Sequence, residues 1–236
     1  MRSARALALL GGFAALAGCT TTQQQAAWLR MNNARLRASE LSVRVTTPGS
    51  DVAVEQVSAV SGGGHSAVVV RVRNLGSHAL SDLPISVGAR AASGKRTYLN
   101  AAPGLDFFQT HLPVIRAHGR LTWVYATSHR LPAGARVFAN VGSRSLAARP
   151  PLPQIEVERA AITRAGVVRL NVVNRSSVPQ YQLPVYAFVR RGGTYVAAGQ
   201  ATIGVLSGGG ASALRLQLVG RPQGDLAIEA GPTIFD

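Results

Sequence analysis

The chain has 236 residues, a hydrophobic content of 47%, one cysteine and a formal net charge of +15. The single cysteine excludes an intramolecular disulfide and a cysteine-based metal cluster, and the length suits one large domain or two of ordinary size. Arginine carries nearly all of the positive charge, because Lys95 is the only lysine. Such a charge attracts anionic lipids, anionic polymers or nucleic acid. A preference for arginine codons explains the shortage of lysine but not the scarcity of carboxylates.

The N-terminus has Arg2 and Arg5, an apolar run over residues 6–17, and Leu-Ala-Gly-Cys at positions 16–19. The run has about 12 residues, whereas a membrane-spanning helix needs about 20, so it is predicted to be a signal. The tetrapeptide resembles the lipobox of bacterial lipoproteins. That resemblance implies that residues 1–18 are a cleaved signal peptide and that Cys19 carries the lipid, palmitate included. An ordinary secretory signal with a chance cysteine, or a buried helix, is the alternative.

The residue after the cysteine is Thr20 and not the aspartate of the family's inner-membrane retention signal. The resemblance therefore implies the periplasmic face of the outer membrane in a diderm organism, or the outer face of the cell membrane in a monoderm. Residues 19–40 are expected to form a polar tether and a short helix, the helix beginning near Ala26. This helix either rests on the lipid surface or packs on the body, and its thin apolar stripe favours packing.

An internal repeat follows, because the sequence matches itself at a constant spacing of 100 residues. The identical pairs are Val57/Val157, Val68/Val168, Val72/Val172, Asn74/Asn174, Ser77/Ser177, Leu83/Leu183, Pro84/Pro184 and Arg90/Arg190. We predict a first repeat over residues 41–147, a proline-rich linker over 148–154 and a second repeat over 155–236.

Apolar and polar residues alternate in short segments that are separated by Gly, Pro, Asn and Ser, as around residues 68–73 and 214–218. This pattern is typical of antiparallel sheets with one wet face. We therefore predict an all-β chain with two tandem Ig-like antiparallel β-sandwich domains. The second repeat also resembles the bacterial Ig-like modules known as CARDB and FxLYD domains. The resemblance rests on Val-Val-Asn-Arg-Ser at 172–176, the Gly192-Gly193 hairpin and the glycine turn at 208–210.

Two groups of residues are candidates for binding. Four arginines on predicted outer strand faces can form a surface for an anionic partner, or can simply keep the exposed strands soluble: Arg71, Arg73, Arg169 and Arg215. The insertion with Phe107 and Phe108 either contacts a ligand or partner, or packs into the core. The five histidines all lie in the first repeat, at irregular spacings that favour solvated loops over a metal site.

No catalytic constellation, cofactor motif or metal-ligand pattern is recognised in the sequence. The favoured hypothesis is a lipid-anchored, non-enzymatic interaction or spacer module of the cell envelope. Its expected partners are the membrane, through the N-terminal lipid, and an envelope protein or anionic polymer; nucleic acid is not expected. The alternative hypothesis is a lipoprotein that binds a small molecule or anionic glycan in the first repeat. A third, an enzyme with a dispersed site, has no residue pattern to support it.

Overall fold

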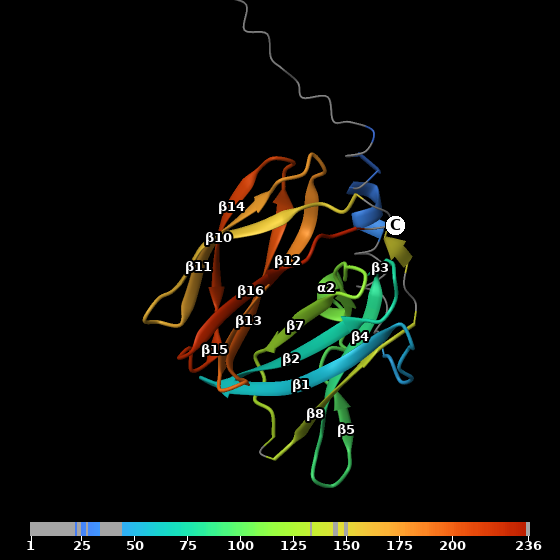
Figure 1. Cartoon of the computed structure of the whole chain (residues 1–236). Coiled ribbons are helices and arrows are strands. Elements are labelled where there is room, and N and C mark those ends of the chain that lie inside the picture. Colours follow the sequence, from blue (N-terminus) through green and yellow to red (C-terminus); the bar gives the residue numbers. More distant parts are fainter. Residues whose placement is uncertain are drawn as a thin grey trace, which may run out of the picture.

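The computed structural model describes residues 22, 25, 26, 28–33, 44–132, 134–143, 146–148 and 151–234 (Figure 1). The expected signal peptide and Cys19 lie outside these ranges. The described residues from 22 to 33 are helical, so the short helix is present and begins before Ala26, while the rest of its predicted length lies outside the described ranges. In the described part of the chain, no helix is both long and apolar enough to cross a bilayer.

The first half of the chain forms two antiparallel sheets, one with strand order β1-β2-β7 and one in which β4 pairs with β5, β6 and β8. The elements are β1 (Val52–Gly62), β2 (His65–Asn74), β3 (Ala79–Ser81), β4 (Leu83–Arg90), β5 (Arg96–Tyr98), α2 (Phe107–Thr110), β6 (His111–Leu112), β7 (Arg120–Thr127), β8 (Arg136–Val141) and β9 (Leu146–Ala148). The short strands β3 and β9 pair with each other. The β1–β2 turn contains Gly63 and Gly64, both with positive φ, as a tight hairpin turn requires.

The second half forms sheets with strand orders β10-β11-β14 and β15-β13-β12-β16. Its strands are β10 (Ile155–Ile162), β11 (Val167–Asn174), β12 (Gln180–Arg191), β13 (Thr194–Leu206), β14 (Ala211–Gln217), β15 (Val219–Gly220) and β16 (Asp225–Ala230). The pairing β10-β11-β14 reproduces β1-β2-β7, and the pair β12-β16 reproduces β4-β8. The predicted all-β fold of antiparallel sandwiches is confirmed.

The two halves also share backbone detail, which supports a repeat-like fold. Asp82 and Gln182 have φ of 57° and 51°, a conformation that is uncommon outside glycine. Each directly precedes a fully buried leucine, Leu83 or Leu183, that belongs to the core of its own half. A residue in the left-handed conformation therefore stands directly before the equivalent buried leucine in both repeats.

The four sheets stack as four layers, with β1-β2-β7 and β15-β13-β12-β16 in the middle (Figure 1). Alternate residues of β12 belong to two different hydrophobic cores. Val185 and Ala187 pack among the residues of the second repeat, whereas Tyr186 and Phe188 belong to the core cluster of the first. The two repeats therefore share one apolar interface. The predicted linker at 148–154 stays a prediction, because residues 149 and 150 lie outside the described ranges.

Strand β2 is buried on both faces, which corrects the expectation of one wet face. Val69 was expected to share an outer face with Arg71, yet Val69 is 0% exposed, as is its cross-strand neighbour Val124. The strands that cover this face are β12, β13 and β15. This face is excluded from solvent because the second repeat packs on it.

Candidate functional surfaces

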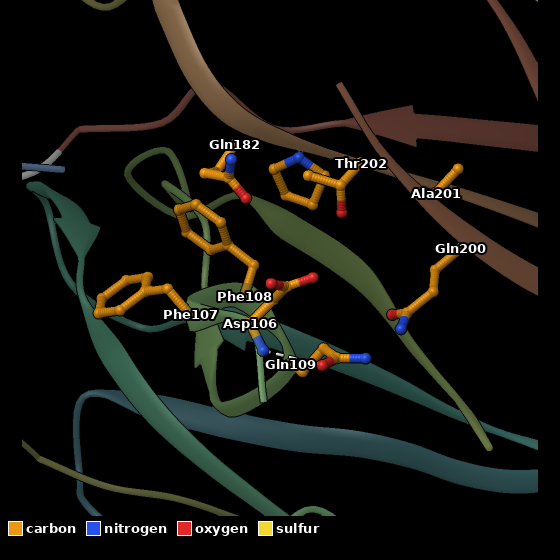
Figure 2. A pocket seen from close by; sticks show the side chains of 9 residues that line it. Asp106, Phe107, Phe108, Gln109, Gln182, Gln200, Ala201 and Thr202 are labelled. Carbon is orange, nitrogen blue, oxygen red and sulfur yellow. Dashed lines mark hydrogen bonds between the residues drawn. The ribbon is translucent and has the colours of Figure 1, made fainter. Parts of the chain in front are cut away.

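A pocket of about 300 Å³ lies where α2 of the first repeat meets β12 and β13 of the second (Figure 2). Its walls include Phe107, Phe108, Gln109, Gln182, Gln200 and Thr202. Figure 2 shows the side chains of the second repeat across from those of α2. Small-ligand sites usually have apolar walls with a few polar groups, whereas most of the residues that line this pocket are polar. The pocket takes residues from both repeats and is thus not confined to the first.

The single turn of α2 is held in place by two hydrogen bonds that involve side chains. The backbone N–H of Asp106 donates to Oε1 of Gln109 at 2.9 Å, which caps the start of the turn. Nε1 of Trp123, a fully buried residue of β7, donates to the carbonyl oxygen of Phe108 at 3.0 Å. These contacts fix the insertion against the core of the first repeat.

Phe107 and Phe108 are 7% and 6% exposed, so little of either ring faces solvent. They cluster with Met31 of the N-terminal helix, and Tyr181 of β12 packs against the same group. The insertion therefore joins three parts of the chain, and its two rings also line the pocket of Figure 2. Of the two readings that the sequence left open, the burial supports packing, while a ligand contact stays a prediction.

His111 is the one histidine among the five that is not exposed. Its ring stacks on that of Phe107, with centroids 4.2 Å apart and planes inclined by 3°. Nδ1 lies 2.9 Å from Oγ1 of Thr110 and 3.3 Å from the carbonyl oxygen of Phe107. Burial lowers the pKa of His111 from 6.5 to about 4, and the hydrogen bond to the Phe107 carbonyl opposes this only in part. The Asp82 carboxylate, 3.9 Å from Nε2, is beyond hydrogen-bonding distance.

We expect His111 to make the protein less stable in acid. The unfolded chain protonates this ring below about pH 6.5 and the folded chain only below about pH 4, so stability falls as the pH drops through that window. Between pH 8 and pH 5 the loss is expected to be about 2 kcal/mol. Urea denaturation of wild type and His111→Gln at both pH values measures it. His111→Gln should remove most of the loss of stability between the two pH values. His129→Gln, which changes an exposed histidine, is the control and should not. Equal losses in the wild type and both variants would contradict the prediction.

The four candidate arginines do not form one surface. Arg71 and Arg73 lie on β2, in the layer that packs against the second repeat, and Arg73 pairs in register with Arg120. Arg169 and Arg215 face each other across β11 and β14, in the outermost layer, and both are exposed. Together with Arg164 they line a shallow depression beside the β10–β11 turn. The structure thus places the four arginines in two separate pairs, Arg71 with Arg73 on β2 and Arg169 with Arg215 in the outermost layer.

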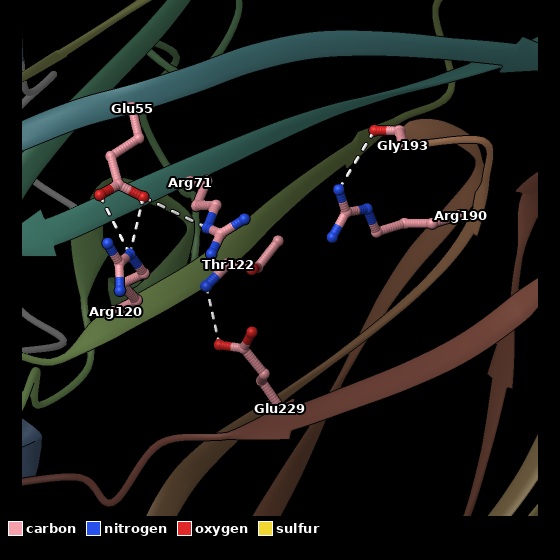
Figure 3. Close-up of polar contacts among 7 residues, drawn as sticks. All are labelled: Glu55, Arg71, Arg120, Thr122, Arg190, Gly193 and Glu229. Atoms are coloured by element: carbon pink, nitrogen blue, oxygen red, sulfur yellow. Dashed lines mark hydrogen bonds and ion pairs between the residues drawn. The ribbon is translucent and has the colours of Figure 1, made fainter.

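Arg71 takes part in a polar group at the edge of the inter-repeat interface (Figure 3). Its Nε lies 3.3 Å from Oε2 of Glu55, whose carboxylate also accepts from Nε of Arg120 at 3.0 Å. These arginines hold the pKa of Glu55 below its ordinary value. Arg71 is therefore neutralised in part by a neighbouring strand.

Glu229 of β16 links the two repeats directly. Its Oε2 accepts the backbone N–H of Thr122 in β7 at 2.7 Å (Figure 3). Burial raises the pKa of Glu229, although the bond to Thr122 and the charge of Arg71 act against that rise. The hydroxyl of Tyr186 is fully buried and has no hydrogen-bond partner among the described residues. The interface is thus mostly apolar, with a small polar group at Glu229.

Within the described residues, no group of three or more His, Cys, Asp or Glu side chains is arranged to hold a metal ion. Cys19, the predicted lipid attachment residue, lies outside them. The sequence did not single out Gln182, Gln200 or Thr202, because they belong to the second repeat and nothing in the pattern places that repeat against α2. Met31 was missed for the same reason, since its aromatic neighbours are far along the chain.

Similarity to known proteins assigns neither a family nor an activity to this chain. No protein-family model and no curated protein sequence matches this chain. Among solved structures, a transglutaminase of red sea bream is 14% identical over 80% of this chain and 32% of its own, with a TM-score of 0.22. The C-terminal globular domain of an oligosaccharyltransferase from Pyrococcus abyssi is 11% identical over 85% of this chain and 51% of its own, with a TM-score of 0.24. This chain thus spans about a third and about half of those two structures, and at such low TM-scores neither likeness bears on its activity.

Proposed function

We propose that the chain is a lipid-anchored protein of the cell envelope, and that its two sandwich repeats act as a non-enzymatic interaction or spacer module. The lipid on Cys19 holds the module to the membrane, and an envelope protein or anionic polymer binds the body. In a diderm organism the anchor lies in the periplasmic face of the outer membrane; in a monoderm it lies in the outer face of the cell membrane.

The observation that carries the proposal is the lipobox-like tetrapeptide at 16–19 behind a charged, apolar leader. The body supports the spacer role, because four sheets share apolar interfaces from one repeat to the next. Because the repeats pack on each other, the body bends little between them and holds its far end at a fixed position relative to the membrane. The exposed pair Arg169 and Arg215 offers a cationic face for an anionic partner.

Cys19→Ser is expected to abolish labelling with an alkyne analogue of palmitate and to release the protein into the soluble fraction of lysed cells. The reason is that serine lacks the thiol to which the lipid is attached. Thr20→Ser changes the neighbouring residue without touching the thiol and should leave both labelling and membrane association intact. Membrane association that survives Cys19→Ser would contradict the anchor.

A second candidate function is the binding of a small polar molecule, favoured by the pocket at α2, which Gln182 and Gln200 line together with Phe108 (Figure 2). Thermal unfolding with a panel of sugars, amino acids and small anions, for wild type and Gln200→Leu, separates the two candidates. A rise in melting temperature that the substitution removes favours a ligand carrier.

A further inference from the structure

The N-terminal helix and the second repeat enclose an apolar groove of about 640 Å³. Its lining includes Trp28 and Leu29 from the helix and Pro179, Tyr181 and Val205 from the second repeat. The helix is fixed to the body because Met31 is buried against Phe107 and Phe108. The groove is therefore already formed by packing and does not require a partner to assemble it.

The groove is where the described residues expose most of their large apolar side chains. Trp28, Leu29 and Val205 are 51%, 56% and 61% exposed, and Val178, 41% exposed, adjoins Pro179 at its edge. The other large apolar side chain of comparable exposure in the described residues is Leu75. Since exposed apolar patches are costly in water, a concentration of this kind marks a contact surface.

The chain length limits where this surface can lie once Cys19 is acylated. Cys19 is six residues before Gln25, which lines the groove, and six residues span at most about 20 Å. An acyl chain in the bilayer thus keeps the groove close to the lipid surface. Tryptophan and tyrosine are the side chains enriched at that boundary, because they have an apolar body and a polar edge. Arg30, exposed on the same helix, adds attraction to anionic headgroups.

We infer that the Trp28–Val205 groove lies in the headgroup region of the bilayer, so that the protein contacts the membrane through its own folded surface as well as through its lipid. The inference rests on the proposed anchor at Cys19. With two contacts, the lipid and the groove, the body is held in one orientation relative to the membrane. The two-contact arrangement also strengthens membrane binding, since a single acyl chain gives only marginal attachment.

The test uses the purified lipidated protein, which begins at Cys19, in vesicles that contain phosphatidylglycerol and lipids brominated near the top of the acyl chains. The chain has two tryptophans, Trp28 and the fully buried Trp123. Emission from Trp28 should shift to the blue and be quenched, and bromine deep in the acyl chains should quench it less, because interfacial helices sit about 5–10 Å into the boundary. Trp28→Phe should remove the quenching, leaving the Trp123 emission unchanged.

Flotation with the vesicles reports the anchor, and quenching of Trp28 reports the groove, so the two proposals fail separately. Val205→Ser should reduce the quenching, whereas Leu75→Ser, which changes an exposed leucine outside the groove, should leave it unchanged. Protein that floats with the vesicles while its Trp28 is not quenched would overturn the inference and leave the groove to a protein partner or a second copy. Protein that does not float would overturn the anchor; in that case unquenched Trp28 would overturn the groove's bilayer contact as well.

Discussion

Val69→Arg is expected to destabilise the protein by about 4 kcal/mol, a large share of the stability of an ordinary domain. Val69 is 0% exposed and lies in the layer where the second repeat packs on β2. An arginine there brings an uncompensated charge and extra volume into an apolar interface. Urea denaturation, followed by the emission of buried Trp123, measures the loss of unfolding free energy.

The repeat supplies the matched control. Position 169 is equivalent to position 69 and already carries arginine, but there Arg169 is exposed and no further sheet of the described residues covers it. Arg169→Val should therefore change the unfolding free energy by no more than about 0.5 kcal/mol. Because the interface is shared, the wild type should unfold in a single transition. Two separate transitions, or equal effects of the two substitutions, would mean that the repeats are not packed on each other in solution.

The strands and the repeat were predictable from the sequence, because they are encoded locally. Alternation of apolar residues along β2 and β11 places one face inward, and glycine pairs such as Gly192-Gly193, with φ of 55° and 82°, specify the hairpins. Both signals can be recognised from residues that are close together in the sequence. They predicted strands, turns and antiparallel sheets, but not the order of the strands in each sheet.

The packing of one repeat on the other was missed, although the sequence held a signal for it. In register, Val69 faces Val124 in the first repeat, and Arg169 faces Arg215 at the matching place in the second. A valine pair in place of an arginine pair indicates that one of two similar faces is covered. We interpreted the outer faces as alike and therefore expected both to be wet.

The candidate sites were less accessible to sequence reasoning. The pocket at α2 depends on contact between an insertion of the first repeat and Gln200 of the second, and no local pattern reports such a distance. The contact between Met31 and Phe107 likewise joins segments that are remote in the chain. Only the proposed anchor residue, Cys19, is predicted from a contiguous motif.

The identical residues Asn74 and Asn174 hold the same place in their repeats. Nδ2 of Asn74 donates to the carbonyl oxygens of His78, Ile115 and Arg116 at 2.7, 3.3 and 3.1 Å. Nδ2 of Asn174 donates to those of Val178, Leu206 and Ser207 at 2.8, 3.4 and 3.1 Å. Each Oδ1 accepts the backbone N–H two residues later, from Gly76 at 2.8 Å and from Ser176 at 3.0 Å.

Each asparagine is 0% exposed, so its amide satisfies backbone groups that water does not reach. It ties the end of β2 or β11 to the turn that follows and to a segment more than thirty residues further along the chain. An asparagine suits this place because its amide both donates and accepts, which neither aspartate nor leucine can do.

Asn74→Ala and Asn174→Ala are therefore each expected to lower the unfolding free energy by about 3 kcal/mol, because buried carbonyl and amide groups lose their partners. Aspartate at either position should be no better, since its carboxylate cannot donate to the carbonyl oxygens. Asn171→Ala, on β11 beside Asn174 in sequence but only partly buried, is the control and should cost at most about 0.5 kcal/mol. Urea denaturation of the wild type and of these variants measures the losses. If the alanine variants of Asn74 and Asn174 lost as little unfolding free energy as Asn171→Ala, the shared network would not stabilise the repeats. If only one of them lost stability, the two turns would differ in solution despite their matching hydrogen bonds.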